Sequence, residues 1–129
     1  MEKPLIESWI NEAKKDENAD KCGMYLTHIG VVRKTPERKV RENADIMDEV
    51  SFLDFSYDSE KVKNAVSKVE NFPGIYYVRV WLNFGRLKVG DDIMQILIGG
   101  DIRPNVINAL EYLLSEIKGN CVKENEIFE

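Results

Sequence analysis

Apolar and polar residues follow two different periods along the chain, and the changes between them predict its helices and strands. The first apolar residues recur at helical spacing, which predicts a helix from about Pro4 to Lys15. Four later stretches are rich in β-branched and aromatic residues and have the length of strands: 23–32, 50–57, 75–82 and 93–98. Glycines at positions 85 and 90 predict a turn region between the last two.

Two further helices follow from apolar residues at every third or fourth position. Ser59 is a suitable N-cap for a helix that extends to Glu70. The clearest helix starts after Asp101, which is its predicted N-cap, and ends at Gly119, a natural residue after a helix C-terminus. Lys118, at the end of this helix, suits the negative end of the helix dipole.

Residues 33–49 interrupt the pattern, because they carry five basic and five acidic residues with few apolar side chains. This composition predicts a mobile surface loop over 34–49. Loops of this length are uncommon without a function, so closure over a substrate is one interpretation and simple disorder is another.

The order of the elements predicts an α+β fold. The strands at 75–82 and 93–98 are expected to be joined by a tight turn and must then be antiparallel, which argues against a doubly wound parallel sheet. A length of 129 residues fits one domain over 1–129 and is enough for a core that needs no disulfide or metal.

Composition narrows the possible partners. The chain has 18 Lys and Arg against 23 Asp and Glu, a net charge of −5, which disfavours binding to nucleic acid or to an anionic membrane. We see neither a signal peptide nor an apolar run near the roughly 20 residues that span a bilayer. We therefore expect a cytoplasmic protein. Cys22 and Cys121 lack metal-ligand spacing, so they are expected to be reduced thiols and no metal site is predicted.

The common catalytic motifs are missing. No phosphate-binding P-loop, dinucleotide fingerprint or GxSxG elbow is present. His28, the single histidine, lies in a predicted strand, where a structural role is more common than a catalytic one. The carboxylates of Glu124 and Glu126 fall in a predicted tail and are expected to be solvated.

Cations at the ends of elements are the more informative feature. Arg33 follows the first strand, Arg103 opens the last helix and Lys123 follows it, while Arg86 and Lys88 lie in the turn region. If these side chains converge, they form an anion site on an acidic protein. Surface ion pairing is the alternative for each of them.

Together these positions resemble the MoaE family, the large catalytic subunit of molybdopterin synthase. The similarity spans about residues 4–124. It lies in four stretches: residues 22–33, which end in G-V-V-R; 50–61, VSFLDFSYDSEK; 85–91, GRLKVGD; and 103–118, which opens with an arginine.

The resemblance implies an α/β hammerhead fold, with an antiparallel sheet and flanking helices, in a homodimer. Two copies of a MoaD-like ubiquitin-fold sulfur carrier would complete a heterotetramer. The carrier's Gly-Gly thiocarboxylate tail would enter a pocket and pass sulfur to cyclic pyranopterin monophosphate, and two transfers would form the dithiolene. No cofactor, metal or nucleotide is consumed.

The resemblance also implies roles for the cations. Arg33, Arg103, Arg86 and Lys88 would bind the substrate, because arginine binds phosphate through two parallel hydrogen bonds. Lys123 and Arg103 would be catalytic, since a cation stabilises developing oxyanion charge.

Some positions depart from the family pattern. Ile102 replaces a histidine, His28 replaces a phenylalanine, and Lys123 aligns only through a short deletion that otherwise leaves Asn125 there. A second hypothesis is therefore a non-catalytic MoaE-like binding module for a sulfur carrier. A third is an unrelated α+β protein.

Overall fold

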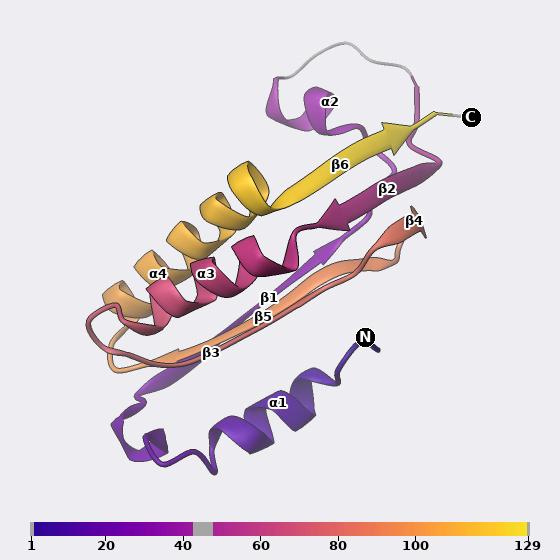
Figure 1. The fold of residues 1–129 in the computed structure, drawn as a ribbon. Coiled ribbons are helices and arrows are strands. Elements are labelled where there is room, and N and C mark those ends of the chain that lie inside the picture. Colours follow the sequence, from indigo (N-terminus) through magenta and orange to yellow (C-terminus); the bar gives the residue numbers. More distant parts are fainter. Residues whose placement is uncertain (1, 43–47, 129) are drawn as a thin grey trace.

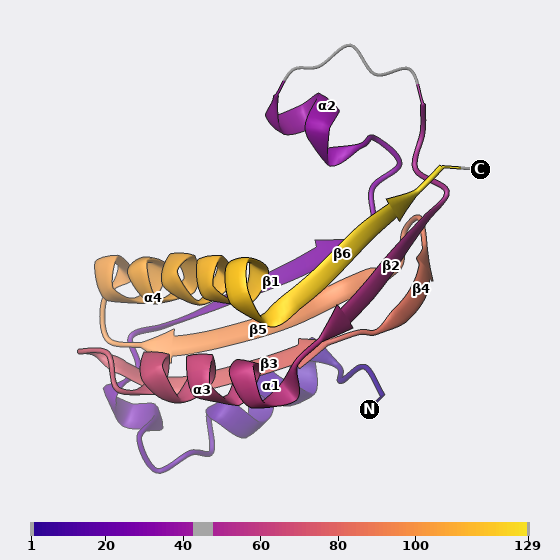
Figure 2. The same cartoon turned by 45° about the horizontal axis from the view of Figure 1, so that its top comes forward.

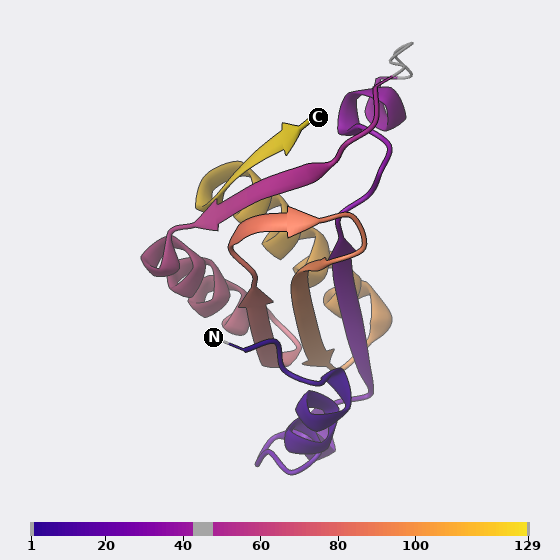
Figure 3. The same ribbon diagram turned by 90° about the vertical axis from the view of Figure 1, so that its right-hand side faces the viewer.

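The strands that the structure describes form two antiparallel sheets. The computed structural model describes residues 2–42 and 48–128. In the first sheet the order is β1 (Met24–Val31), β5 (Asp92–Gly100) and β3 (Ile75–Leu82). In the second it is β4 (Gly85–Lys88), β2 (Phe52–Tyr57) and β6 (Val122–Ile127). Figure 3 shows the second sheet at one end of the first.

Helices cover both faces of the first sheet. Figures 1 and 2 show α3 and α4 side by side on one face and α1 on the other. The remaining helical turns are short and lie at element ends or in connections. The helical elements are α1 (Ile6–Ala13), η1 (Ala19–Lys21), α2 (Glu37–Arg41), α3 (Ser59–Glu70), α4 (Arg103–Glu116) and η2 (Ile117–Cys121). None of these described helices has the length and apolar content that crossing a bilayer requires.

The central strand β5 is buried on both faces because it lies between these helical layers. Ile96 and Ile98 belong to the core under α3 and α4. Leu97 points to the opposite face, where it packs with Trp81 and with Trp9 of α1. A strand covered on both faces has a largely apolar sequence, which explains the residues from Ile93 to Ile98, where buried Gln95 is the exception.

The predicted α+β class is confirmed, and most predicted elements are present. The bounds of β3 and α3 agree with the prediction, but the caps differ. Asp58, not Ser59, caps α3, because its Oδ1 accepts hydrogen bonds from the Glu60 and Lys61 backbone N–H groups at 3.0 and 3.2 Å. Ile102 occupies the N-cap of α4, while the carboxylate of Asp101 accepts a bond from the Asn105 side chain at 2.9 Å.

Two of the three strands of the second sheet differ from the prediction. Residues 85–88 were predicted as a turn and 122–127 as a tail, but both are strands paired with β2. The tight turn expected between β3 and β5 is instead a longer connection that contains β4. The antiparallel pairing of β3 with β5 is nevertheless as predicted.

The predicted loop at 34–49 contains structure at both ends. Helix α2 occupies 37–41, and Pro36 is buried. The Val50 backbone N–H donates to the Lys34 carbonyl at 2.8 Å, so the two ends of the segment lie together. Residues 43–47 lie outside the described residues, and the mobility of the loop stays a prediction.

Candidate functional site

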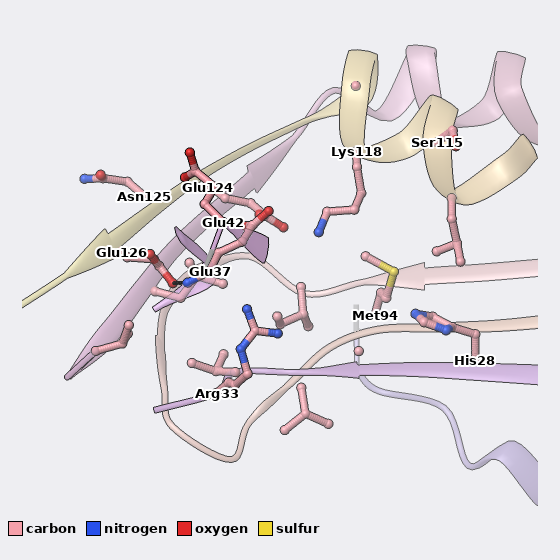
Figure 4. A pocket seen from close by; sticks show the side chains of 18 residues that line it. His28, Arg33, Glu37, Glu42, Met94, Ser115, Lys118, Glu124, Asn125 and Glu126 are labelled. Atoms are coloured by element: carbon pink, nitrogen blue, oxygen red, sulfur yellow. Dashed lines mark hydrogen bonds between the residues drawn. The ribbon is translucent and has the colours of Figure 1, made fainter. Parts of the chain in front are cut away.

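A cleft of about 1060 Å³ lies where the two sheets meet the end of α4. Strands β1 and β5 contribute one wall, β2 and β6 another, and the last turn of α4 with η2 a third. The segment that contains α2 contributes Glu37 and Glu42. Figure 4 shows Arg33, Lys118 and His28 lining this space from different elements, whereas the Asn125 side chain points away from it.

Glycine at position 30 keeps one side of the cleft open. Gly30 is paired with Met94 in the first sheet. A Cβ atom at Gly30 would lie 3.1 Å from Met94 Cγ and 3.9 Å from His28 Nε2. A larger side chain at position 30 would therefore occupy the space beside the imidazole of His28.

Two cations, Arg33 and Lys118, line the cleft from different elements. Arg33 follows β1, and its Nε donates to the Thr35 carbonyl at 3.1 Å. Lys118 lies in η2, where it is exposed. Figure 4 shows both side chains reaching into the middle of the cleft. The sequence predicts Lys118 only as a cation at the end of a helix, 15 residues after Arg103. The π-helical turn η2, which directs the Lys118 side chain into the cleft, was not predicted.

Carboxylates gather at one end of the same cleft. Glu124 and Glu126 come from β6, and Glu37 and Glu42 from the segment that contains α2. The Glu126 Oε2 accepts a hydrogen bond from the Glu37 backbone N–H at 3.1 Å, which ties α2 to β6. The predicted tail is instead strand β6: Glu124 is exposed, as expected for a solvated carboxylate, whereas Glu126 is half-buried, and both line the cleft.

Lys123 and Arg86 meet on the opposite face of the second sheet. Side chains alternate along a strand, so Lys123 points away from the cleft that Glu124 and Glu126 line. It lines a shallow hollow of about 370 Å³ together with Arg86. Arg86 donates two hydrogen bonds to the Asp54 carboxylate, at 2.9 and 3.0 Å. These hydrogen bonds and the charge of Arg86 lower the pKa of Asp54.

Arg103 and Lys88 lie apart from both groups. Arg103 is exposed in the first turn of α4, beyond the end of β5 that lies far from Arg33. Nine residues of β5 at about 3.3 Å each separate the two ends by roughly 30 Å. Lys88 is exposed at the end of β4, where its backbone N–H donates to the Asp91 carboxylate at 2.8 Å. Within one chain, therefore, the five cations do not converge on one site, and the pair of Arg86 with Asp54 matches the alternative of surface ion pairing.

Comparison with known protein families identifies the family of this chain. The family described as MoaE protein matches residues 5–120. The chain belongs to the MoaE family. Membership of this family supports a role in molybdopterin biosynthesis. No curated protein matches the chain.

Solved structures share the MoaE fold at low sequence identity. A molybdopterin synthase from Staphylococcus aureus is similar with a TM-score of 0.73 and 18% identity, over 98% of this chain and 88% of that one. A MoaE protein from Burkholderia ambifaria has a TM-score of 0.71 and 13% identity, over 99% and 85%. A complex of subunits 1 and 2 of molybdopterin-converting factor from Helicobacter pylori gives 0.65 and 17%, over 97% and 80%.

The metal-ligating residue types and the two thiols of this MoaE-family chain lie apart from one another in the described residues. In the parts of the chain that the structure describes, no three His, Cys, Asp or Glu side chains are grouped as metal ligands. Cys22 and Cys121 are free thiols. Burial raises the pKa of both, so neither is poised as a thiolate nucleophile at neutral pH.

Proposed function

We propose that this chain is the large subunit of a molybdopterin synthase. It transfers sulfur from the thiocarboxylate of a MoaD-like ubiquitin-fold carrier to cyclic pyranopterin monophosphate, forming the dithiolene. The observation that carries this proposal is the joint presence of Arg33 and Lys118 in one cleft of about 1060 Å³. Small-molecule sites usually measure about 300–1,000 Å³, so the cleft has room for a pterin phosphate and a peptide end.

The two cations have different tasks in this proposal. Among the described residues, Arg33 makes one hydrogen bond, from its Nε to the Thr35 carbonyl, so its terminal guanidinium nitrogens can bind the substrate phosphate. Lys118 stabilises the oxyanion that forms when the carrier's thiocarboxyl carbon is attacked. The catalytic role predicted for Lys123 passes to Lys118, because Lys123 faces the outer hollow beside Arg86.

A homodimer is part of the proposal because Arg103 is too far from Arg33 within one chain. If Arg103 binds the same substrate, it does so from a second protomer, and each site is shared. Arg33→Ala and Arg103→Ala variants would then each be inactive alone. Mixed, they would recover roughly a quarter of the wild-type sites through heterodimers. No recovery on mixing, in chains that exchange protomers, would exclude a shared site.

The direct test is reconstitution with the thiocarboxylated carrier and cyclic pyranopterin monophosphate, with dithiolene product measured by mass spectrometry. We expect product from the wild type and a loss on the order of 10²–10³ in turnover for Lys118→Ala. Lys63→Ala is the matched control, because Lys63 is exposed on α3 and faces Glu60 at 3.9 Å. A wild-type chain that binds the carrier but forms no dithiolene would refute catalysis.

A non-catalytic binding module is the second candidate, and the carboxylates in the cleft favour it. Glu37, Glu42, Glu124 and Glu126 place negative charge in a space that must accept two anions, the carrier's tail and the substrate phosphate. Carrier binding without product would support this module. Location in the cytoplasm stays a prediction under either function.

A further inference from the structure

His28 occupies one end of the cleft, away from the carboxylates. It is the only histidine of the chain, and its side chain is half-buried. Figure 4 shows the imidazole near Met94 at the end of the cleft opposite to the glutamates, with Arg33 and Lys118 between them. Along the cleft the glutamates come first, then the two cations, and then His28. The imidazole therefore lies closer to the cations than to the acids.

The imidazole has hydrogen-bonding capacity that the protein leaves unused. Among the described residues, neither ring nitrogen of His28 has a hydrogen-bond partner. The two nitrogens are not among the buried unpaired side-chain atoms of the described residues, so they are open to a molecule in the cleft. Because Gly30 has no side chain, the space next to His28 Nε2 belongs to the cleft.

The surroundings of His28 keep it neutral at physiological pH. Burial lowers its pKa, and the charge of Lys118 lowers it further. Lys118 from η2 is the charged group that acts on the imidazole, and uncharged Met94 from β5 lies beside it. Arg33, which follows β1, lies farther along the cleft towards the glutamates. The glutamates of β6 and of the α2 segment lie beyond the two cations. A neutral imidazole offers one nitrogen that can accept a proton.

Sulfur transfer needs such an acceptor, if the proposed function holds. The carrier begins with a terminal thiocarboxylate and ends with a carboxylate, so an oxygen atom must replace the sulfur. Once the sulfur has bonded to the substrate carbon, it bridges that carbon and the carrier's carbonyl carbon as a thioester. Water is the co-reactant that supplies the oxygen.

We propose that His28 is the general base of the cleft and takes a proton from the water that releases the carrier. The water oxygen bonds to the carrier's carbonyl carbon while its proton moves to a ring nitrogen of His28. The bond between the carrier's carbonyl carbon and the sulfur then breaks, and its electron pair stays on the sulfur, which remains on the substrate as a thiolate. The carrier leaves as a carboxylic acid that loses its proton to solvent. Lys118 faces the oxyanion in between.

The test compares the wild type with His28→Ala in the reconstituted system, across pH. Loss of a general base lowers turnover by about 10²–10⁴, and added imidazole should restore part of it in His28→Ala, where the removed ring leaves room. The wild-type rate should fall as pH drops below about 6.5. Because the chain has one histidine, NMR gives its titration directly, and the two midpoints should coincide.

Controls separate this inference from the proposed function. Thr27→Ala alters the neighbouring exposed residue on the other face of β1 and should leave turnover unchanged. His28→Gln is a second variant in case the alanine variant does not fold. Turnover within about twofold of wild type in either variant, or an acid limb that persists without His28, overturns the assignment of His28 alone. An inactive wild type overturns both proposals.

Discussion

Removal of the Glu126 carboxylate should release α2 from the wall of the cleft. The Glu126 Oε2 accepts the Glu37 backbone N–H at 3.1 Å, across 89 residues of sequence. This bond is partly buried and joins the start of α2 to β6. Helix α2 has only five residues, too few to be stable alone, so its position depends on such tertiary bonds.

The size of the effect follows from the chemistry of the bond. Hydrogen bonds to a charged group contribute about 1.5–3 kcal/mol, and partial exposure places this one at the lower end. Since 1.4 kcal/mol is a factor of ten in an equilibrium constant, Glu126→Ala should raise the open fraction of this segment about tenfold.

Hydrogen exchange of the Glu37 amide measures that fraction directly by NMR. We expect exchange about ten times faster in Glu126→Ala, and a smaller change in Glu126→Gln, whose side-chain carbonyl still accepts. Glu124→Ala is the matched control, because it removes a carboxylate from the same face of β6 that has no hydrogen bond to α2 among the described residues. Equal exchange in Glu126→Ala and Glu124→Ala would refute the reasoning.

Three further changes test the core, the outer hollow and the cleft. Leu113→Ala removes a fully buried side chain of α4 and should cost about 2–5 kcal/mol in urea unfolding. Asp54→Asn weakens an exposed pair with Arg86 and should change dithiolene formation little, although stability should lose part of its pH dependence below pH 4. The pKa of His28 is lower in the folded chain than in the unfolded chain. As pH falls below about 6.5, the unfolded chain therefore takes up a proton more readily than the folded chain, which lowers the stability of the fold. The melting temperature should therefore drop over that range in the wild type and not in His28→Gln.

The sequence predicted the buried elements well because burial leaves a strong pattern. Strand β3 and helix α3 have the predicted bounds, and both place apolar residues at the period of their structure. The same reasoning failed for β4 and β6. The sequence of β6, VKENEI, carries charges on both faces, because one face lines a cleft and the other a shallow hollow. Its strand conformation comes from pairing with β2, which no local pattern records.

The site was predicted in part for a related reason. Arg33 was recognised because it ends a clear strand, and it does line the cleft. Lys118 was recognised as a cation but not as part of the site, because a turn of π-helix after α4 determines where it points. Arg103 lies at the predicted helix start, but sequence alone does not tell which end of the sheet that helix begins on.

The register of β6 decides the charge of the cleft. Because side chains alternate, a shift of one residue would turn Lys123 and Asn125 inward and Glu124 and Glu126 outward. The observed register is held by the β2–β6 pairs and, beyond their ends, by hydrogen bonds from Ser51 N to the Ile127 carbonyl at 2.8 Å and from Asp58 N to the Cys121 carbonyl at 2.9 Å. Cys121 is buried in the main core, so it fixes where β6 begins. Insertion of one residue directly after Cys121 should therefore turn Lys123 into the cleft and Glu124 and Glu126 out of it. The affinity of the cleft for phosphate should then rise.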